Sequence, residues 1–110
     1  MSTFRYRIEG RVCEAETGRP LVGLRVCAYD LDLLKDDSLG EAVSDADGSF
    51  QIRFTERAFQ ELPGERPDLY LRIFDASGRV ELASTQSEVR RSARVEERFE
   101  VRIPSTALRG

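Results

Sequence analysis

The chain has no histidine and no tryptophan, and its 110 residues include only one lysine, one methionine and two cysteines. Without histidine it lacks the imidazole that most often acts as a general base or as a ligand of catalytic metals. Two cysteines are too few for the framework of a disulfide-rich secreted domain. No apolar run reaches the length of a membrane span or a signal-peptide core. We therefore expect no membrane insertion and a protein that is cytoplasmic as written, with export as part of a larger machinery as the alternative.

The charged residues do not favour a nucleic-acid partner. Sixteen of the seventeen basic residues are arginine, but twenty acidic residues outnumber them and leave a net charge of −3. Binding to a polyanion is driven by the release of counterions from a basic surface, which this balance does not supply. A GC-rich coding sequence explains the excess of arginine over lysine without any partner.

The length and composition predict one domain. With 40% apolar and 34% charged residues, the chain lies outside the disordered class. We place the domain at residues 1–104 and a short C-terminal tail at 105–110, after Pro104. Cys13 and Cys27 are expected to be reduced thiols, although a bridge between them stays open. The oligomeric state also stays open, as does whether residues 1–110 are a whole gene product.

Alternation of apolar and polar side chains predicts an all-β fold. Phe50, Ile52 and Phe54 alternate with polar residues, which is the period of a strand with one buried face. The same period predicts strands at 4–12, 24–29, 69–74, 79–85 and 94–103, with a hairpin over 41–54. A single helical turn is expected at 57–62. The predicted architecture is a seven-stranded antiparallel β-sandwich with one short helical turn.

The hairpin turn carries two aspartates and a glycine. Asp45 and Asp47 can accept hydrogen bonds from their own backbone, and Gly48 can take a positive φ, so we interpret these residues as a structural turn. Alternate acids before a glycine also begin calcium loops. A complete loop needs a bidentate glutamate beyond the glycine, where this sequence has a strand, so we expect no metal here.

The most unusual loop is 31–38, which combines leucines and acids. Leu33 and Leu34 lie outside the strand alternation, and Tyr70, Arg72 and Phe74 form the second face of a predicted strand. Aromatic residues and arginine are enriched in interface cores, so these five residues are the candidate binding site for another protein. The alternative is that the loop is a lid that buries its leucines on the aromatics. A weak site for a hard cation is a further alternative, against a solvated connection, which we favour.

Several pieces of the chain match one family of β-sandwiches. They are Gly10-Arg11-Val12, residues 17–21 (TGRPL), Gly23 and residues 45–50 (DADGSF), and they fall within about residues 8 to 75. This pattern resembles the prealbumin-like domains, which are also known as transthyretin-like or carboxypeptidase regulatory-like domains. The resemblance implies two facing sheets of three or four strands. For bacterial members it implies accessory domains of secretion or contractile injection machinery.

The enzymes of that family require residues that this chain lacks. The resemblance to 5-hydroxyisourate hydrolases implies histidines and a C-terminal Tyr-Arg-Gly-Ser motif, of which only Arg109-Gly110 is present. The intradiol dioxygenases, another relative, bind iron through tyrosines and histidines. We therefore expect no enzyme, no catalytic residue and no cofactor. The predicted function is a non-catalytic binding or adaptor module, with an oligomeric small-ligand carrier and an unrecognised hydrolase as alternatives.

Overall fold

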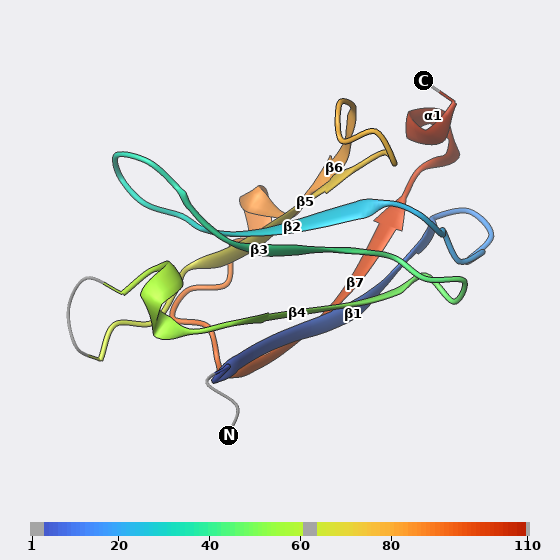
Figure 1. Cartoon of the computed structure of the whole chain (residues 1–110). Coiled ribbons are helices and arrows are strands. Elements are labelled where there is room, and N and C mark those ends of the chain that lie inside the picture. Colours follow the sequence, from blue (N-terminus) through green and yellow to red (C-terminus); the bar gives the residue numbers. More distant parts are fainter. Residues whose placement is uncertain (1–3, 61–63, 110) are drawn as a thin grey trace.

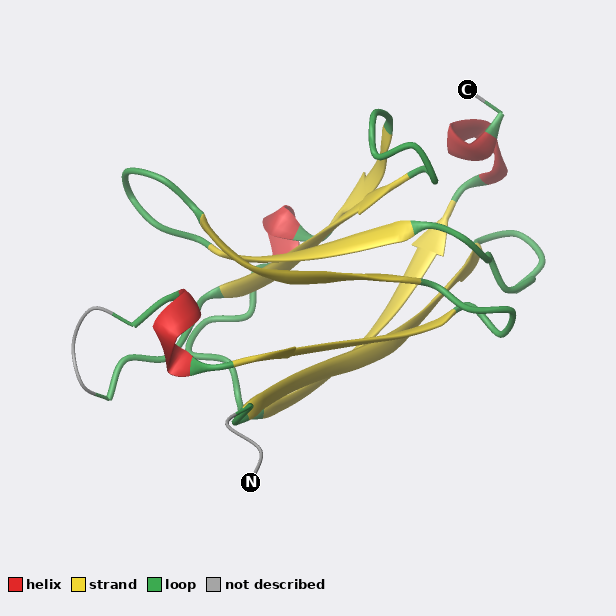
Figure 2. Cartoon of the chain, viewed as in Figure 1, coloured by secondary structure: helices red, strands yellow, loops and turns green. Residues whose placement is uncertain are grey.

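The computed structural model describes residues 4–60 and 64–109, which form two β-sheets with three short helical segments (Figures 1 and 2). The strands are β1 (Tyr6–Glu14), β2 (Arg25–Asp30), β3 (Asp37–Val43), β4 (Ser49–Phe54), β5 (Leu69–Phe74), β6 (Glu81–Ser84) and β7 (Glu96–Ile103). The helical segments are the 3-10 turns η1 (Glu56–Ala58) and η2 (Gln86–Glu88) and the short helix α1 (Ser105–Leu108). The all-β prediction is confirmed, and the predicted strand 69–74 has the bounds of β5.

The two sheets face each other across one core. The first has the strand order β4-β1-β7, and the second has the order β3-β2-β5-β6. Figure 1 shows them as two layers, with β4, β1 and β7 in one and β2, β3 and β5 in the other. The buried cluster draws apolar side chains from the inner faces of both, for example Ile8, Phe50, Val26 and Leu71. In β4 and β7 the buried residues alternate with exposed ones, which is why the sequence alternation located these strands.

The predicted hairpin over 41–54 is wrong in its pairing. Its two arms exist as β3 and β4, but β3 pairs with β2 and β4 pairs with β1, in different sheets. The Ser44 backbone forms hydrogen bonds with Gly23 and Leu24, which lead into β2. The next residue, Asp45, accepts a backbone hydrogen bond from Gly48 and donates one to Ser49, the first residue of β4. The turn therefore carries the chain from one sheet to the other. A tight acidic turn is compatible with a hairpin and with a connection between two sheets, because the residues of the turn do not determine which strands its two arms pair with.

The prediction of a wholly antiparallel sandwich is also wrong, because β1 and β7 run parallel over the register from Arg7–Glu96 to Glu14–Ile103. Gly10 lies at the centre of this pair. A Cβ atom there would lie 2.2 Å from the Phe99 carbonyl oxygen and 2.9 Å from the Phe50 ring. The glycine therefore permits the backbones of β1 and β7 to approach closely. A glycine within a predicted strand is typical of such a close approach.

The ends and connections differ in part from expectation. The helical turn predicted at 57–62 is η1, which covers Glu56–Ala58, and the last two predicted residues lie outside the described ones. Residues 105–108, which belong to the predicted C-terminal tail, form α1, whose Ala107 and Leu108 pack against the core.

Cys13 and Cys27 are both free thiols. Among the described residues, no helix has the length and apolar character that crossing a bilayer requires.

Gly48 should not tolerate a side chain. Its φ is +76°, and a Cβ atom would lie 2.4 Å from the Val12 carbonyl oxygen, which is fixed by the backbone. Gly18 has the same φ but open space around it, so it is a matched control. We expect strain of about 1–3 kcal/mol in Gly18→Val and a clearly larger loss in Gly48→Val, measured by urea unfolding. Equal losses would mean that the close contact does not matter.

Phe50 should be one of the main anchors of the core. It is buried, and it lies over Gly10 on the inner face of the three-stranded sheet. Phe50→Ala should cost about 3–5 kcal/mol, because the lost ring leaves a cavity. Leu34→Ala, at a fully exposed position, should change the free energy of unfolding by less than about 0.5 kcal/mol. A Phe50→Ala protein that unfolds at the wild-type urea concentration would contradict the burial of this ring.

Candidate functional site

A pocket of about 520 Å³ lies where the loop after β2 meets the segment before β5. Its lining mixes acids, arginines and leucines, and we name it the carboxylate pocket: Asp30, Leu31, Asp32, Leu33, Glu65, Arg66, Asp68 and Arg91. Four of these residues are acidic and two are basic. The pocket is therefore rich in both hydrogen-bond acceptors and hydrogen-bond donors, with an excess of acceptors.

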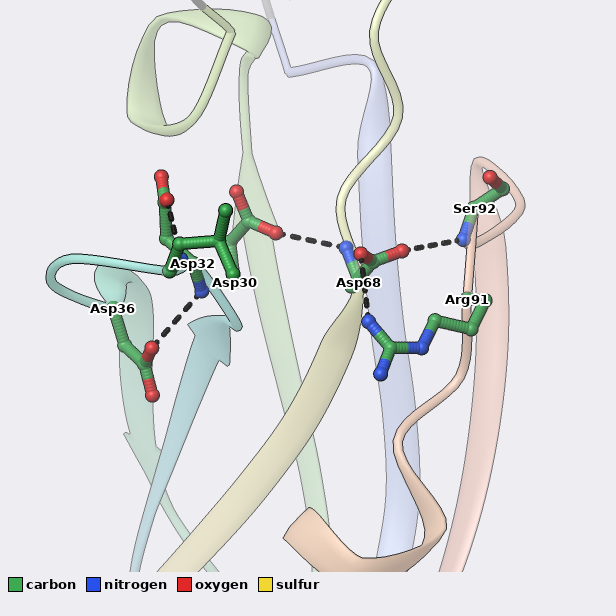
Figure 3. Close-up of polar contacts among 7 residues, drawn as sticks. Asp30, Asp32, Asp36, Asp68, Arg91 and Ser92 are labelled. Atoms are coloured by element: carbon green, nitrogen blue, oxygen red, sulfur yellow. Dashed lines mark hydrogen bonds and ion pairs between the residues drawn. The ribbon is translucent and has the colours of Figure 1, made fainter.

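The register of β2 against β5 builds the pocket. Because Asp30 pairs with Leu69, the residues just beyond each strand end lie side by side. The Leu31 backbone N–H donates to the Asp68 carbonyl at 2.8 Å, and the Asp68 N–H donates to the Asp30 carboxylate at 2.8 Å. Figure 3 shows Asp30 reaching across to Asp68 in this way. Two loops that are distant in sequence are thus joined at one end of the sandwich.

A third segment closes the pocket through Asp68. The Asp68 carboxylate pairs with the Arg91 guanidinium at 3.1 Å and accepts the Ser92 backbone N–H at 2.9 Å (Figure 3). Ser92 is the one non-glycine residue with positive φ, +48°, in the described part of the chain. Such a conformation persists only where the surroundings hold it, and here the bond to Asp68 does so. Asp68 therefore fixes the position of the arginine.

Asp36 anchors the other side of the loop. One of its oxygens accepts the Asp32 backbone N–H at 3.0 Å, and the other accepts the Tyr70 hydroxyl in a short hydrogen bond. Desolvation by burial, with Asp36 as the next cause, raises the pKa of Tyr70 well above its ordinary value. The loop is therefore tied to β5 through a protonated tyrosine.

The Asp30 carboxyl is the most perturbed acid of the pocket. Desolvation by burial raises its pKa from 3.8 to about 6, and the negative charges of Asp37, Asp68 and Asp32 add to this effect. The bond from the Asp68 N–H opposes the shift only in part. Asp30 can therefore change its charge near neutral pH, which ordinary carboxyls do not.

Leu33 and Leu34 lie at the tip of the loop and are 100% and 98% exposed. The alternative that they form a lid over the aromatics of β5 is wrong, because a lid would bury the two leucine side chains and both are exposed. Internal hydrogen bonds of the loop, including one from the Leu33 N–H to the Asp32 carboxylate at 2.6 Å, hold the tip outward. Leu33 borders the carboxylate pocket, so one of the two leucines contributes to it.

Tyr70, Arg72 and Phe74 lie together on β5, away from the leucines. The Tyr70 side chain is buried, and its ring stacks on Tyr29 with the centroids 5.4 Å apart. The Arg72 guanidinium lies 5.0 Å from the centre of the Phe74 ring and pairs with Glu81. The five candidate binding residues thus divide into a loop tip and a self-contained row on the outer face of the four-stranded sheet.

Sequence reasoning recognised the acidic loop but missed Asp68, Arg91 and Ser92. These residues are 38 or more positions away from Asp30, and none belongs to a motif. A signal did exist, because Asp68 directly precedes a well-defined strand and Asp30 directly follows one. Antiparallel pairing of those two strands would have brought them together, but the sequence does not state which strands pair.

Comparison with known proteins shows a shared fold. No family model and no curated protein matches the chain. A 9R-lipoxygenase from Cyanothece PCC8801 matches with a TM-score of 0.59 and 23% identity over 87% of this chain and 16% of the lipoxygenase. The dioxygenase domain of a dioxygenase carbohydrate-binding protein fusion from the cellulolytic bacterium Streptomyces sp. SirexAA-E matches with a TM-score of 0.55 and 18% identity, over 94% of this chain and 81% of that domain. At these identities the likeness concerns the fold alone.

These matches correct two expectations. The structural neighbours are domains of a lipoxygenase and a dioxygenase, and neither is described as transthyretin-like. What holds of the predicted resemblance is the coarser statement of a small all-β domain with two sheets. The prediction of a non-catalytic binding or adaptor module of a secretion machinery is wrong, because the structural neighbours are domains of a lipoxygenase and a dioxygenase and neither is described as an adaptor.

The residues of this chain do not fit the iron of intradiol dioxygenases. The sequence has no histidine, and the described residues contain no group of three histidine, cysteine or acidic side chains placed to hold a metal. Tyr6 is buried between Phe54 and Phe59, and Tyr29 and Tyr70 stack on each other. Burial raises the pKa of Tyr29 and of Tyr70, which opposes the tyrosinate form that iron requires. We assign no step to iron here.

The raised pKa of Asp30 predicts a pH dependence of stability. A carboxyl whose pKa is higher in the folded state stabilises the fold below its unfolded pKa, near 4, and loses this contribution as pH rises through about 6. Asp30→Asn keeps the acceptor for the Asp68 N–H and removes the charge. Its melting temperature should exceed the wild-type value above pH 6, and the difference should shrink toward pH 4. Asp47→Asn, in the exposed turn at the other end, should show no such trend. A constant Asp30→Asn difference would contradict the shift.

Proposed function

We propose that this chain is an oxygenase-related module that recognises its substrate, a small hydroxyl-rich molecule, in the carboxylate pocket. The observation that carries the proposal is the close placement of the Asp30 and Asp68 carboxylates with the Arg91 guanidinium around one opening. A hydroxyl group can donate to a carboxylate and accept from a guanidinium at the same time. The lipoxygenase and dioxygenase neighbours support the link to oxygenases.

The charge of the pocket narrows the class of ligand. Four acids against two arginines disfavour an anion, and the arginines that flank the opening disfavour a simple cation. A neutral molecule with several hydroxyl groups meets both kinds of side chain without an uncompensated charge. The volume of about 520 Å³ is within the range of small-molecule sites, and Leu31 and Leu33 offer apolar contact to its carbon atoms.

The proposal is tested by titration of the isotope-labelled protein with catechol, glucose and myo-inositol, followed by NMR. We expect at least one of these probes to shift the backbone amide signals of Leu31, Asp68 and Ser92. Loss of one hydrogen bond is worth about 1 kcal/mol, so Asp30→Ala and Arg91→Ala should each weaken that binding by about fivefold or more.

Asp47→Asn is the control variant, because Asp47 lies in the β3–β4 turn at the opposite end of the sandwich (Figure 1). It should bind the probe as the wild type does. Melting temperatures of all variants show whether they are folded. Amide shifts that are absent with every probe, or that persist unchanged in both pocket variants, would contradict recognition in this pocket.

A further inference from the structure

β7 is an edge strand with one side open. It ends the three-stranded sheet, is eight residues long and pairs only with β1 in the described part of the chain. A hollow of about 440 Å³, lined by Arg11, Arg98, Phe99 and Glu100, borders its middle. An open edge offers a row of backbone donors and acceptors to another strand.

The parallel pairing determines which backbone groups face that open side. The Arg7 N–H donates to the Val95 carbonyl at 2.7 Å, and the Ala15 N–H donates to the Ile103 carbonyl at 2.9 Å. In a parallel ladder the bonded residues alternate, so the odd-numbered residues of β7 bond to β1. The even-numbered residues therefore present their N–H and C=O groups to the open edge: Glu96, Arg98, Glu100 and Arg102.

The side chains of the same four residues form an alternating row of charge. They read Glu, Arg, Glu, Arg along the strand, and each is more than half exposed. Across to β1 the signs are already complementary, since Glu96 pairs with Arg7 at 2.9 Å and Arg98 with Glu9 at 3.6 Å. Charges on an edge usually oppose pairing, because like charges would meet. When glutamate and arginine alternate along the edge, a register exists in which each charge lies opposite one of the other sign.

One antiparallel register of β7 with itself places every charge opposite its complement. When two copies meet about a two-fold axis at Phe99, Glu96 lies opposite Arg102 of the other copy, and Arg98 lies opposite Glu100. These are the residues whose backbone groups face the edge, so the charge pairs coincide with hydrogen-bonded pairs. A shift by two residues sets Arg98 against Arg98 or Glu100 against Glu100. A shift by one residue sets open backbone groups against groups already bonded to β1.

We propose that β7 is a self-association site, at which a second copy of this chain adds antiparallel to the edge. The two three-stranded sheets then become one six-stranded sheet, joined by about eight backbone hydrogen bonds. Arg90 already donates to the Arg98 carbonyl at 2.7 Å. That oxygen has two acceptor positions, so it can also accept from the second copy. The ion pairs are exposed and set the register more than the affinity, so the dimer is weak and depends on concentration.

The wild-type protein tests the proposal without any substitution. Sedimentation velocity from about 10 µM to about 1 mM should show a monomer that converts to a dimer. Amide hydrogen exchange over the same range should slow at Glu96, Arg98, Glu100 and Arg102. The alternate residues Glu97, Phe99 and Val101 should not change, because their N–H groups are bonded to β1 at every concentration. A monomer at about 1 mM, or exchange that does not follow this alternation, would overturn the proposal.

Two charge variants test the register. Arg98→Glu with Arg102→Glu makes an acidic edge, and Glu96→Arg with Glu100→Arg makes a basic edge. Each should self-associate about tenfold more weakly than the wild type or worse, because four pairs become repulsive. An equimolar mixture of the two should restore association. Arg53→Glu, on the outer face of β4, is the control and should dimerise as the wild type does. Folded variants that still self-associate normally, or a mixture that stays monomeric, would refute pairing through β7.

Discussion

The absence of a side chain at Gly10 is the constraint on which the three-stranded sheet depends. The Phe99 backbone of β7 and the Phe50 ring of β4 both approach the space that a Cβ atom would fill. Any other residue would push β7 away from β1 or displace the ring from the core. Gly10 thus permits the close spacing of β1 and β7, and their parallel register places the backbone groups of the even-numbered residues of β7 on the open edge.

The sequence located the strands because burial on one face leaves a period of two. β5 was predicted with its observed bounds, and β7 within two residues. Pairing was not predictable in the same way. β3 and β4 have the turn of a hairpin but lie in different sheets, and β7 has the alternation of an antiparallel strand but runs parallel to β1. Alternation reports which face is buried, not which neighbour supplies the hydrogen bonds.

The same limit applies to the carboxylate pocket. The acids that follow β2 stand out in the sequence, because several lie within one short loop. Asp68 and Arg91 do not, since charged residues are frequent in the connections of this chain and neither residue belongs to a motif. Their role arises only when β2 and β5 pair and the Arg90 backbone bonds to Leu69. The site is thus a product of strand order, which a single sequence does not encode in any local pattern.

The outer faces of the two sheets explain why an edge, and not a face, is the natural place for self-association. On the four-stranded sheet, Tyr29 stacks on Tyr70, and Arg72 lies near the Phe74 ring and pairs with Glu81. These side chains satisfy one another and leave little apolar surface for a second copy to cover. On the three-stranded sheet the outer face is charged, and such pairs contribute little affinity in water. The open edge of β7 still offers backbone donors and acceptors to another strand, and the charges on β7 then decide which strand can pair with it.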